Sequence, residues 1–531
     1  MREILIIGAG ATGLKCAVRA RRRDENAKIT VVDAEKVISF GRCGLPFFVS
    51  GQIHEIDELR KTSYGVLRDE EYFKKVFEIE VLTKTRAISI DRRRKVVRVS
   101  RKGKEDELNY EYLVLATGAS PVRIFGGDER ILTFFYPEDA EKVVELWENG
   151  AERAAVIGSG FIGLEVCEAL RLLEMDVTLI ELQNQVAPMF DVEIANFIES
   201  HLREKGIKVL LSKRVREIVP KEKLKVVADE EIEVDLVIQA IGVKPNVELA
   251  RNSEIEIGET GAIKVNEFLQ TSDKSIFAGG DCVENFHLVS GKKVLAPFGS
   301  VANKHGRIIG DNVTGGKSKF PGIVGTSIFK VFDLTVAKTG LSEKEAKECG
   351  FKPYSVLLSA FDKSHYYPKA SNMRIKLVVN KDEKLLGAQI VGSNGVDRRI
   401  DVFATAIYAK MSIEDISNLD LAYSPPYAPA IDPVITSAHV AMNKRDGLLD
   451  STRELKGLVI DVRNEDEVKR KPLNFARNLP LSELRERAEE LPKDMEITTI
   501  CSIGVRAYLA SRILKSMGYK AKAFEGGIAF L

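Results

Sequence analysis

The pattern Gly-x-Gly-x-x-Gly occurs twice in this chain, at residues 8–13 and 158–163, and it constrains the fold more than any other feature. Each copy follows a short apolar run and opens a helical pattern. Glycines at this spacing allow a tight turn and bring the backbone close to a pyrophosphate at the helix N-terminus. We therefore expect two dinucleotide-binding units, whose binding residues are Gly8, Gly10 and Gly13 in one and Gly158, Gly160 and Gly163 in the other.

An acidic residue ends the strand that follows each glycine pattern. Asp33 stands 20 residues after Gly13, where a carboxylate holds a ribose hydroxyl. Glu181 has the matching place in the second unit, where an acid accepts from the 2′-hydroxyl of NAD and repels the 2′-phosphate of NADP. Residues 182–185 contain no arginine that would bind this phosphate, so we expect NADH in the second unit.

The spacing of apolar residues predicts an α/β chain with several domains. Short apolar runs at 4–7, 29–32, 112–116, 154–157, 177–180 and 236–240 alternate with helical patterns, which is typical of parallel sheets with helices on both faces. Antiparallel strands are expected at 326–338, 354–361, 373–380 and 384–391, then a helix near 396–410 and a proline-rich stretch at 421–429 that cannot be helical. A small α/β unit follows, with strands at 458–462 and 497–501 and a helix near 482–490.

Composition excludes several classes of function. The net charge of +1 gives no overall field for nucleic acid or anionic membrane, and no run approaches the roughly 20 apolar residues of a membrane helix. The N-terminal apolar run leads straight into the glycine pattern and is a strand, not a signal peptide. Six widely spaced cysteines form no disulfide framework, and six histidines show no metal spacing. We expect a cytoplasmic protein with no metal site.

Cys43, in Ser39-Phe40-Gly41-Arg42-Cys43-Gly44-Leu45-Pro46, stands alone. A flavin reductase with an internal dithiol needs a second cysteine a few residues on, where this chain has Phe48, and the next cysteine is Cys167. If Cys43 is redox-active, it must pair with something external: a small thiol, a sulfane sulfur or a peroxide.

Further segments resemble the pyridine nucleotide–disulfide oxidoreductases. Residues 115–121, with Thr117 and Gly118, resemble the crossover from the FAD unit to the NAD unit of that family, and 242–246 resemble its return. Residues 277–281 resemble its second FAD motif, whose aspartate, here Asp281, binds the ribitol chain. The resemblance implies an FAD domain at 1–115 and 250–322, an NADH domain at 116–249 and an α+β dimerisation domain at 323–442.

Within that family, the Cys43 segment looks like the branch with a single redox cysteine. This branch includes coenzyme A disulfide reductases, persulfide reductases, NADH oxidases and NADH peroxidases. Cys43 would lie near a helix start and beside the flavin, where its thiolate is favoured. The branch usually has asparagine before the cysteine, and this chain has Arg42, which would stabilise a thiolate or reach a substrate phosphate. We predict that Ser39 and Arg42 contact the substrate.

Two tyrosine segments, 364–368 and 423–427, resemble those of coenzyme A disulfide reductases. There, tyrosines of the partner subunit reach over the flavin cysteine, which implies a homodimer with a shared active site. A phenol can hydrogen-bond to or protonate a leaving thiolate. We predict Tyr367 and Tyr423 for this role, with Tyr366 and Tyr427 as rivals and plain interface packing as the alternative.

Basic residues of the first helix suggest coenzyme A as a further ligand. Lys15, Arg19 and Arg22 share one helix face at i, i+4 and i+7. In the coenzyme A branch, basic residues here and near Lys304 meet the phosphates of CoA. The alternative is that these cations complement the helix dipole and face solvent.

After a polar linker at 443–453, residues 454–531 resemble a rhodanese-like domain. Cys501 ends a strand, and the loop to Arg506 opens a helix, which would form an anion nest that stabilises a persulfide. Four residues separate Cys501 from Arg506, whereas phosphatase relatives have five, so sulfur fits better than phosphate. Residues 472–477 depart from the usual rhodanese sequence, and a non-catalytic domain is the alternative.

These features together predict an NADH-dependent FAD enzyme that reduces persulfide, polysulfide or CoA-persulfide sulfur to hydrogen sulfide through Cys43, with Cys501 carrying sulfane sulfur. The alternatives are a coenzyme A disulfide reductase, an NADH oxidase or peroxidase, and a redox sensor without turnover.

Overall fold

The computed structural model describes residues 2–531. The chain forms two compact units, of which the first contains residues 2–184 and 202–323 and the second contains 185–201 and 324–531.

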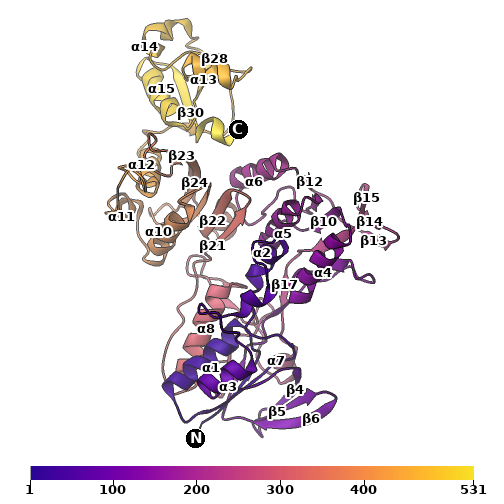
Figure 1. The fold of residues 1–531 in the computed structure, drawn as a ribbon. Helices are drawn as coiled ribbons and strands as arrows, with labels where there is room; N and C mark the ends of the chain where they lie inside the picture. The colour runs from indigo at the N-terminus through magenta and orange to yellow at the C-terminus, as the bar shows by residue number, and fades with distance from the viewer. Residues whose placement is uncertain (1) are drawn as a thin grey trace. The chain divides into compact units, whose positions relative to one another are not determined.

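The first unit contains a five-stranded parallel sheet with strand order β18-β7-β1-β2-β3. Its strands are β1 (Glu3–Ile7), β2 (Lys28–Val32), β3 (Glu80–Leu82), β7 (Tyr112–Leu115) and β18 (Ile276–Ala278). The helices α1 (Ala11–Arg23) and α8 (Gly299–Asn312) lie side by side (Figure 1). The strands β1, β2 and β7 confirm the strands expected at 4–7, 29–32 and 112–116, and their side chains are almost all buried, as parallel strands require.

A second parallel sheet in the first unit has the order β12-β11-β10-β16-β9. Its strands are β9 (Ile131–Leu132), β10 (Arg153–Ile157), β11 (Asp176–Ile180), β12 (Lys208–Leu210) and β16 (Leu236–Gln239). The helices that accompany it in the chain are α4 (Pro137–Glu148), α5 (Phe161–Leu172) and α6 (Val192–Glu204). The two sheets confirm the expected pair of α/β units.

Smaller elements complete the first unit. The short strands are β4 (Thr85–Asp91), β5 (Val96–Arg101), β6 (Lys104–Asn109), β8 (Ala119–Pro121), β13 (Glu217–Pro220), β14 (Leu224–Val227), β15 (Glu231–Val234), β17 (Val243–Pro245), β19 (Asn285–Phe286) and β20 (Lys293–Val294). The short helices are η1 (Arg42–Gly44), α2 (Leu45–Val49), η2 (Ile56–Arg60), α3 (Glu70–Phe77) and α7 (Glu248–Asn252). β8 and β17 pair antiparallel, so the two crossovers between the sheets run beside each other.

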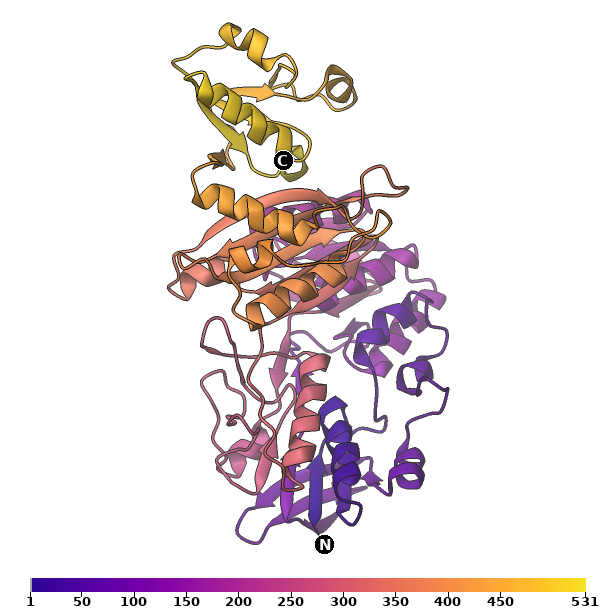
Figure 2. The same cartoon turned by 90° about the vertical axis from the view of Figure 1, so that its left-hand side faces the viewer.

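The second unit contains a five-stranded antiparallel sheet with the order β21-β22-β25-β24-β23. Its strands are β21 (Ser327–Val331), β22 (Leu334–Gly340), β23 (Tyr354–Phe361), β24 (Asn372–Val379) and β25 (Leu385–Gly392). The accompanying helices are α9 (Glu343–Glu348), α10 (Val396–Tyr408), α11 (Ile413–Ser417) and α12 (Pro433–Arg445), of which α10 and α12 lie across the sheet in Figure 2. The single strand expected at 326–338 is wrong: Phe332, with φ of +55°, turns the chain into a hairpin.

The C-terminal part of the second unit is a smaller parallel sheet with the order β26-β30-β29-β27-β28. Its elements are β26 (Ser451–Thr452), β27 (Leu458–Asp461), α13 (Glu465–Arg470), β28 (Arg477–Asn478), α14 (Leu484–Arg487), η3 (Ala488–Glu490), β29 (Glu496–Ile500), α15 (Val505–Ser516), β30 (Lys520–Phe524) and η4 (Gly527–Phe530). The stretch expected to be a linker, 443–453, is partly ordered: α12 continues to Arg445, and β26 pairs with β30.

Within residues 2–531, no helix is long and apolar enough to cross a membrane. The same residues contain no group of three or more His, Cys, Asp or Glu side chains that could hold a metal ion.

Candidate active sites

The first glycine loop joins β1 to α1 and packs against the end of β7. Gly8 has φ of +111°, and a Cβ there would lie 2.1 Å from the carbonyl oxygen of Ala116. A Cβ on Gly13 would lie 1.8 Å from the oxygen of Gly8. At Gly10, by contrast, no heavy atom of the other described residues beyond its chain neighbours lies within 4 Å of the Cβ position. No side chain caps α1 and its first turn has no acid, so its backbone N–H groups can meet a phosphate.

The second glycine loop, between β10 and α5, repeats this geometry. Gly158 has φ of +98°, and a Cβ there would lie 2.6 Å from the oxygen of Ala240. A Cβ on Gly163 would lie 2.0 Å from the oxygen of Gly158, whereas Gly160 faces space that is open among the described residues. Both loops therefore fit a dinucleotide pyrophosphate.

The two predicted acids lie beside these loops. Asp33 accepts from the backbone N–H of Ala9 at 2.5 Å, inside the first loop. Glu181 accepts from the N–H of Ser159 at 2.8 Å and from its hydroxyl at 2.6 Å, inside the second loop. Each carboxylate thus lies next to the helix N-terminus, where a ribose would lie.

Asp281 follows β18 in the first unit. Burial raises the pKa of its carboxyl, and the charge of Arg42 opposes this. No described residue donates a hydrogen bond to this carboxylate, so its oxygens remain available to ligand hydroxyls. The adjacent Gly280 donates its N–H to Nδ1 of His305 at 3.1 Å, and burial lowers the pKa of that imidazole to about 4.

The crossover residues Thr117 and Gly118 bind the return segment. The Thr117 hydroxyl donates to the carbonyl of Asn246 at 2.7 Å, and the N–H of Asn246 donates to the carbonyl of Gly118 at 3.0 Å. The structure therefore places both residues at the junction of the two sheets, as their resemblance implies.

Cys43 lies in η1, on a loop that is tied to the first glycine loop. The N–H of Ser39 donates to the carbonyl of Ala9 at 3.1 Å, and Gly41 donates to Leu59 at 2.9 Å. Cys43 is exposed, whereas Cys16, Cys167, Cys282 and Cys501 are buried. The surrounding atoms still desolvate its thiol, and this, with the charge of Glu165, raises the pKa of Cys43; Arg42 acts in the opposite direction. Among the protein groups, desolvation and Glu165 therefore outweigh Arg42 at this thiol.

Two residues next to Cys43 shape its surroundings. The guanidinium of Arg42 lies 4.3 Å from the ring centroid of Phe135 and 5.9 Å from that of Tyr136. Glu165, on α5, has its pKa raised to about 7 by burial and by Glu168. The role of Glu165 beside Cys43 does not follow from the sequence, although Glu165 stands two residues after the second glycine pattern.

The basic residues of α1 are not equivalent. Arg19 donates to Asp311 of α8 at 2.5 Å, so much of its charge is neutralised. Lys15 and Arg22 are exposed, and Lys304 is exposed on α8. A Cβ on Gly306 would lie 2.8 Å from Cβ of Lys15, which shows how closely α1 and α8 pack near Lys304.

The two tyrosine segments lie together in the second unit. The N–H of Ser364 donates to the carbonyl of Pro425 at 3.3 Å, which joins one segment to the other. Arg399 of α10, only 1% exposed, donates to the carbonyl of Asp362 and to the carboxylate of Asp432, at the bases of both segments. The four candidate side chains are all exposed: Tyr366, Tyr367, Tyr423 and Tyr427.

Cys501 lies between β29 and α15, as predicted. Its sulfur accepts from the N–H groups of Gly504 at 3.1 Å and Ala507 at 3.4 Å. Backbone donors in this arrangement form a nest that suits a thiolate or a persulfide anion. Arg506 donates to both oxygens of Glu467 at 2.6 and 2.7 Å, and this contact lowers the pKa of Glu467 to about 2. Arg506 thus lies beside the loop and is ion-paired with Glu467.

Comparisons with known proteins agree with this organisation. The family model for the pyridine nucleotide-disulphide oxidoreductases matches residues 2–297, the model for their dimerisation domain matches 326–434, and the rhodanese-like domain matches 445–529.

Three relatives are similar over most of the chain. An NADH oxidase of Methanocaldococcus jannaschii is 37% identical and covers 84% of this chain and 99% of its own length. A CoA-dependent NAD(P)H sulfur oxidoreductase of Pyrococcus furiosus is 38% identical, over 83% of this chain and 99% of its own. The solved structure of an NAD-dependent persulfide reductase from A. fulgidus is 52% identical, covers 99% of both chains and has a TM-score of 0.97.

The glycine loops, their acids and the Cys43 loop thus lie within the segment that the main family model matches. Membership implies FAD and NAD(P)H as cofactors, and the two glycine loops fit them. The chain belongs to the pyridine nucleotide-disulphide oxidoreductase family, with a rhodanese-like domain after its dimerisation domain.

Proposed function

We propose that this protein uses NADH and FAD to reduce persulfide, polysulfide or CoA-persulfide sulfur to hydrogen sulfide through Cys43, while Cys501 carries sulfane sulfur. One observation carries the proposal: an exposed cysteine beside the first glycine loop and a second cysteine in an anion nest occur on one chain. A redox cysteine without an internal partner exchanges with an external sulfur compound.

The cofactors are assigned to the two loops. FAD is held by Gly8, Gly10, Gly13, Asp33, Thr117, Gly118 and Asp281. NADH is held by Gly158, Gly160, Gly163 and Glu181. A flavin bound there supplies the two electrons of NADH to a sulfur–sulfur bond on Cys43.

Cys43 binds the sulfur in an exchange reaction. Its thiolate attacks the outer sulfur of a persulfide, the sulfur–sulfur bond of the substrate breaks, and the thiol leaves. Cys43 then carries the extra sulfur as a persulfide. Two electrons and protons cleave that bond, which releases hydrogen sulfide and restores the thiol. Attack on the inner sulfur instead gives a mixed disulfide and releases hydrogen sulfide first.

A homodimer with a shared site completes the active centre. Tyr367 and Tyr423 of the partner subunit donate a hydrogen bond or a proton to the leaving thiolate. The exposure of both phenols and the presence of a dimerisation domain support this assignment.

Coenzyme A is the favoured thiol carrier. The exposed amines of Lys15 and Lys304 and the guanidinium of Arg22 suit its phosphates, whereas Arg19 is engaged by Asp311. Ser39 and Arg42 contact the substrate near Cys43, and Arg506 borders the sulfur loop of the rhodanese-like domain.

A second candidate is an NADH oxidase in which Cys43 cycles through a sulfenic acid. The name of the M. jannaschii relative supports it. That relative covers only 84% of this chain, however, and the second cysteine, Cys501, has no role in such a cycle.

The proposal is tested by measuring NADH oxidation with three electron acceptors. CoA persulfide and CoA disulfide are offered anaerobically, and oxygen is offered in a separate assay. Turnover with persulfide and one hydrogen sulfide per NADH is expected. Turnover with CoA disulfide alone would show that Cys501 has only an accessory role in the reaction. Turnover with oxygen alone would overturn the assignment of a sulfur substrate.

A further inference from the structure

The antiparallel sheet of the dimerisation domain buries a row of polar side chains on one face. Lys338, Gln389 and Lys376 are aligned across β22, β25 and β24, and they are only 6%, 0% and 2% exposed. An antiparallel sheet commonly leaves its polar face in water, and a buried lysine costs free energy unless it is paired. This face must therefore be covered by groups that complement its charge.

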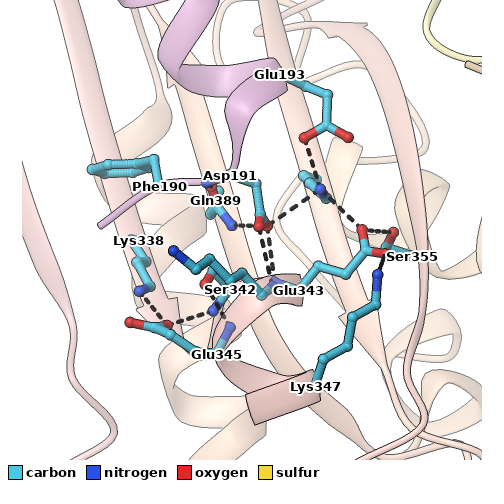
Figure 3. A network of polar contacts seen from close by, with 12 residues as sticks. Phe190, Asp191, Glu193, Lys338, Ser342, Glu343, Glu345, Lys347, Ser355 and Gln389 are labelled. Carbon is cyan, nitrogen blue, oxygen red and sulfur yellow. Dashed lines mark hydrogen bonds and ion pairs between the residues drawn. The ribbon is translucent and has the colours of Figure 1, made fainter. Parts of the chain in front are cut away.

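The segment that leads into α6 supplies part of this cover (Figure 3). Asp191 accepts from Gln389 at 2.6 Å and lies 3.3 Å from the amine of Lys376. Glu193 accepts from Lys376 at 2.8 Å, and Glu343 of α9 lies 3.0 Å from the same amine. Three carboxylates thus surround one buried lysine.

Arg453, directly after β26, supplies the rest of this cover. This guanidinium donates to Glu193 at 2.9 Å, Glu343 at 3.1 Å and the hydroxyl of Ser355 at 2.6 Å. Its Nε donates to Glu525 at 2.8 Å. Burial opposes the charge of Arg453, but the carboxylates outweigh it and raise the pKa of this residue. Arg453 therefore joins the charge cluster of the sheet to Glu525, at the end of β30.

Residues 525–529, which we name the C-terminal strip, run between this sheet and the Cys501 loop. On one side, the Ser359 hydroxyl donates to the carbonyl of Gly526 at 3.2 Å and Nε of Arg374 donates to that of Ala529 at 2.7 Å. On the other side, Ile528 donates its N–H to the carbonyl of Cys501 at 2.9 Å.

The contact between the strip and the loop is too close for a side chain. A Cβ on Gly527 would lie 2.5 Å from the oxygen of Cys501 and 2.7 Å from the nitrogen of Gly504. Gly504 is the residue whose N–H reaches the sulfur of Cys501. A displacement of the strip would therefore also displace a donor of the anion nest.

We propose that the dimerisation domain positions the sulfur-carrying loop through this strip, with Arg453 and Arg374 as positioning residues for Cys501. The inference rests on the proposed function for the role of Cys501 as a sulfur carrier. It adds that the rhodanese-like domain has a fixed position against the dimerisation domain. Contacts from the dimerisation domain hold the strip, and through it part of the Cys501 loop.

The test uses the full-length holoenzyme with Cys43→Ser, so that the exposed thiol does not contribute. The variants are Arg453→Met, Arg374→Met and Ser359→Ala, with Arg453→Lys as the conservative rescue. Arg477→Met is the matched control, because Arg477 pairs with Glu490 on the surface of the rhodanese-like domain.

Two signals report on Cys501 in each variant. The first is the rate at which cyanide removes sulfur from the polysulfide-loaded protein, which gives thiocyanate and the free thiolate. The second is the ultraviolet absorbance of the Cys501 thiolate against pH, taken as the difference from the same variant with Cys501→Ser. The second signal needs neither sulfur substrate nor NADH, so the inference can fail or stand separately from the proposed function.

We expect Arg453→Met and Arg374→Met to slow sulfur removal about tenfold and to shift the thiolate titration to higher pH. In Arg453→Lys both signals should stay close to those of the parent, and in Arg477→Met both should be unchanged. Ser359→Ala removes a single oxygen and keeps the fold, so it tests the strip if the arginine variants do not fold. Parental rates and titrations in the folded variants, Ser359→Ala included, would overturn the inference.

Discussion

At Cys43, charges of opposite sign act on one thiol. Glu165 raises its pKa and Arg42 lowers it, while desolvation is the largest influence. Because Glu165 itself has a pKa of about 7, its charge changes within the physiological range of pH. Near pH 6 it is largely protonated, and its effect on Cys43 is then weaker.

We predict that Glu165→Gln lowers the pKa of the Cys43 thiol by up to about one pH unit, because it removes a nearby negative charge. The measurement is the pH dependence of Cys43 alkylation by iodoacetamide, with peptide mapping. Glu148→Gln, an exposed change on α4, is the control. An unchanged or higher pKa in Glu165→Gln would show that Glu165 does not act on the thiol.

Glu165 also affects stability in a direction that its pKa fixes. The folded state holds its proton up to a pH of about 7, against a reference value of 4.5. Between these values the folded state binds more protons than the unfolded state, so the free energy of unfolding falls as pH rises. We expect the urea midpoint of Glu165→Gln to rise relative to that of the parent between about pH 5 and about pH 8, because most of the interval between the two pKa values lies in this range. A constant difference would contradict the shifted pKa.

In the rhodanese-like domain, the pKa of Glu467 is lowered, whereas that of Glu165 is raised. Its pKa of about 2 lies below the reference of 4.5, so its stabilising contact with Arg506 is present above that reference and is lost as pH falls toward 2. We predict that Glu467→Gln destabilises the domain by about 1 kcal/mol at neutral pH, since the pair is partly screened by solvent. Chemical denaturation checks this, with Glu465→Gln of the same helix as the control. Equal stability of Glu467→Gln and the parent would show that the ion pair has no net effect.

At the scale of elements, each glycine loop contains two kinds of glycine. A Cβ on Gly163 would collide with the Gly158 carbonyl, whereas the Cβ position of Gly160 is open among the described residues. We predict that Gly163→Ala lowers the melting temperature of the protein. Gly160→Ala should leave it unchanged but raise the KM for NADH about tenfold, because the methyl group occupies the space of the pyrophosphate.

Thermal unfolding and NADH kinetics together check this pair of variants. If Gly160→Ala kept the parental KM, the pyrophosphate would not lie on this loop. If Gly163→Ala were as stable as the parent, the close packing of the loop would not limit the fold.

The parallel sheets could be predicted from sequence because their strands are continuous apolar runs. Ala154–Ile157 and Val177–Ile180, for example, were located to within a residue. The hairpin of β21 and β22 was missed, because Phe332 has a left-handed backbone that no glycine or asparagine signals. The helix α12 was not predicted, and its last residues were assigned to the linker because they are polar and charged.

Site residues that belong to a sequence motif could be predicted. Contacts that depend on tertiary packing could not. The glycine loops, Asp33 and Glu181 follow from spacing. The ion pairs Arg19–Asp311 and Arg506–Glu467 join residues that are far apart in sequence, and nothing in the local pattern indicates them. The pKa of Cys43 likewise depends on Glu165, which is distant along the chain.

At the scale of the whole molecule, the proposed shared site predicts complementation between subunits. Cys43→Ser homodimers lack the redox thiol, and Tyr367→Phe/Tyr423→Phe homodimers lack the partner phenols. A heterodimer of the two has one site with both groups intact. We therefore expect a purified heterodimer to have about half the parental activity, while each homodimer has far less.

Differential tags and steady-state assays of the purified heterodimer make this measurement. Activity equal to the mean of the two homodimers would contradict a site shared between subunits. It would leave the tyrosines as interface residues.

The most direct test of the central claim compares the parent with Cys43→Ser in anaerobic NADH oxidation with CoA persulfide, with hydrogen sulfide quantified. We expect one hydrogen sulfide per NADH in the parent and loss of this activity in Cys43→Ser, which still binds FAD. Full hydrogen sulfide production by Cys43→Ser would show that Cys43 does not carry the reaction.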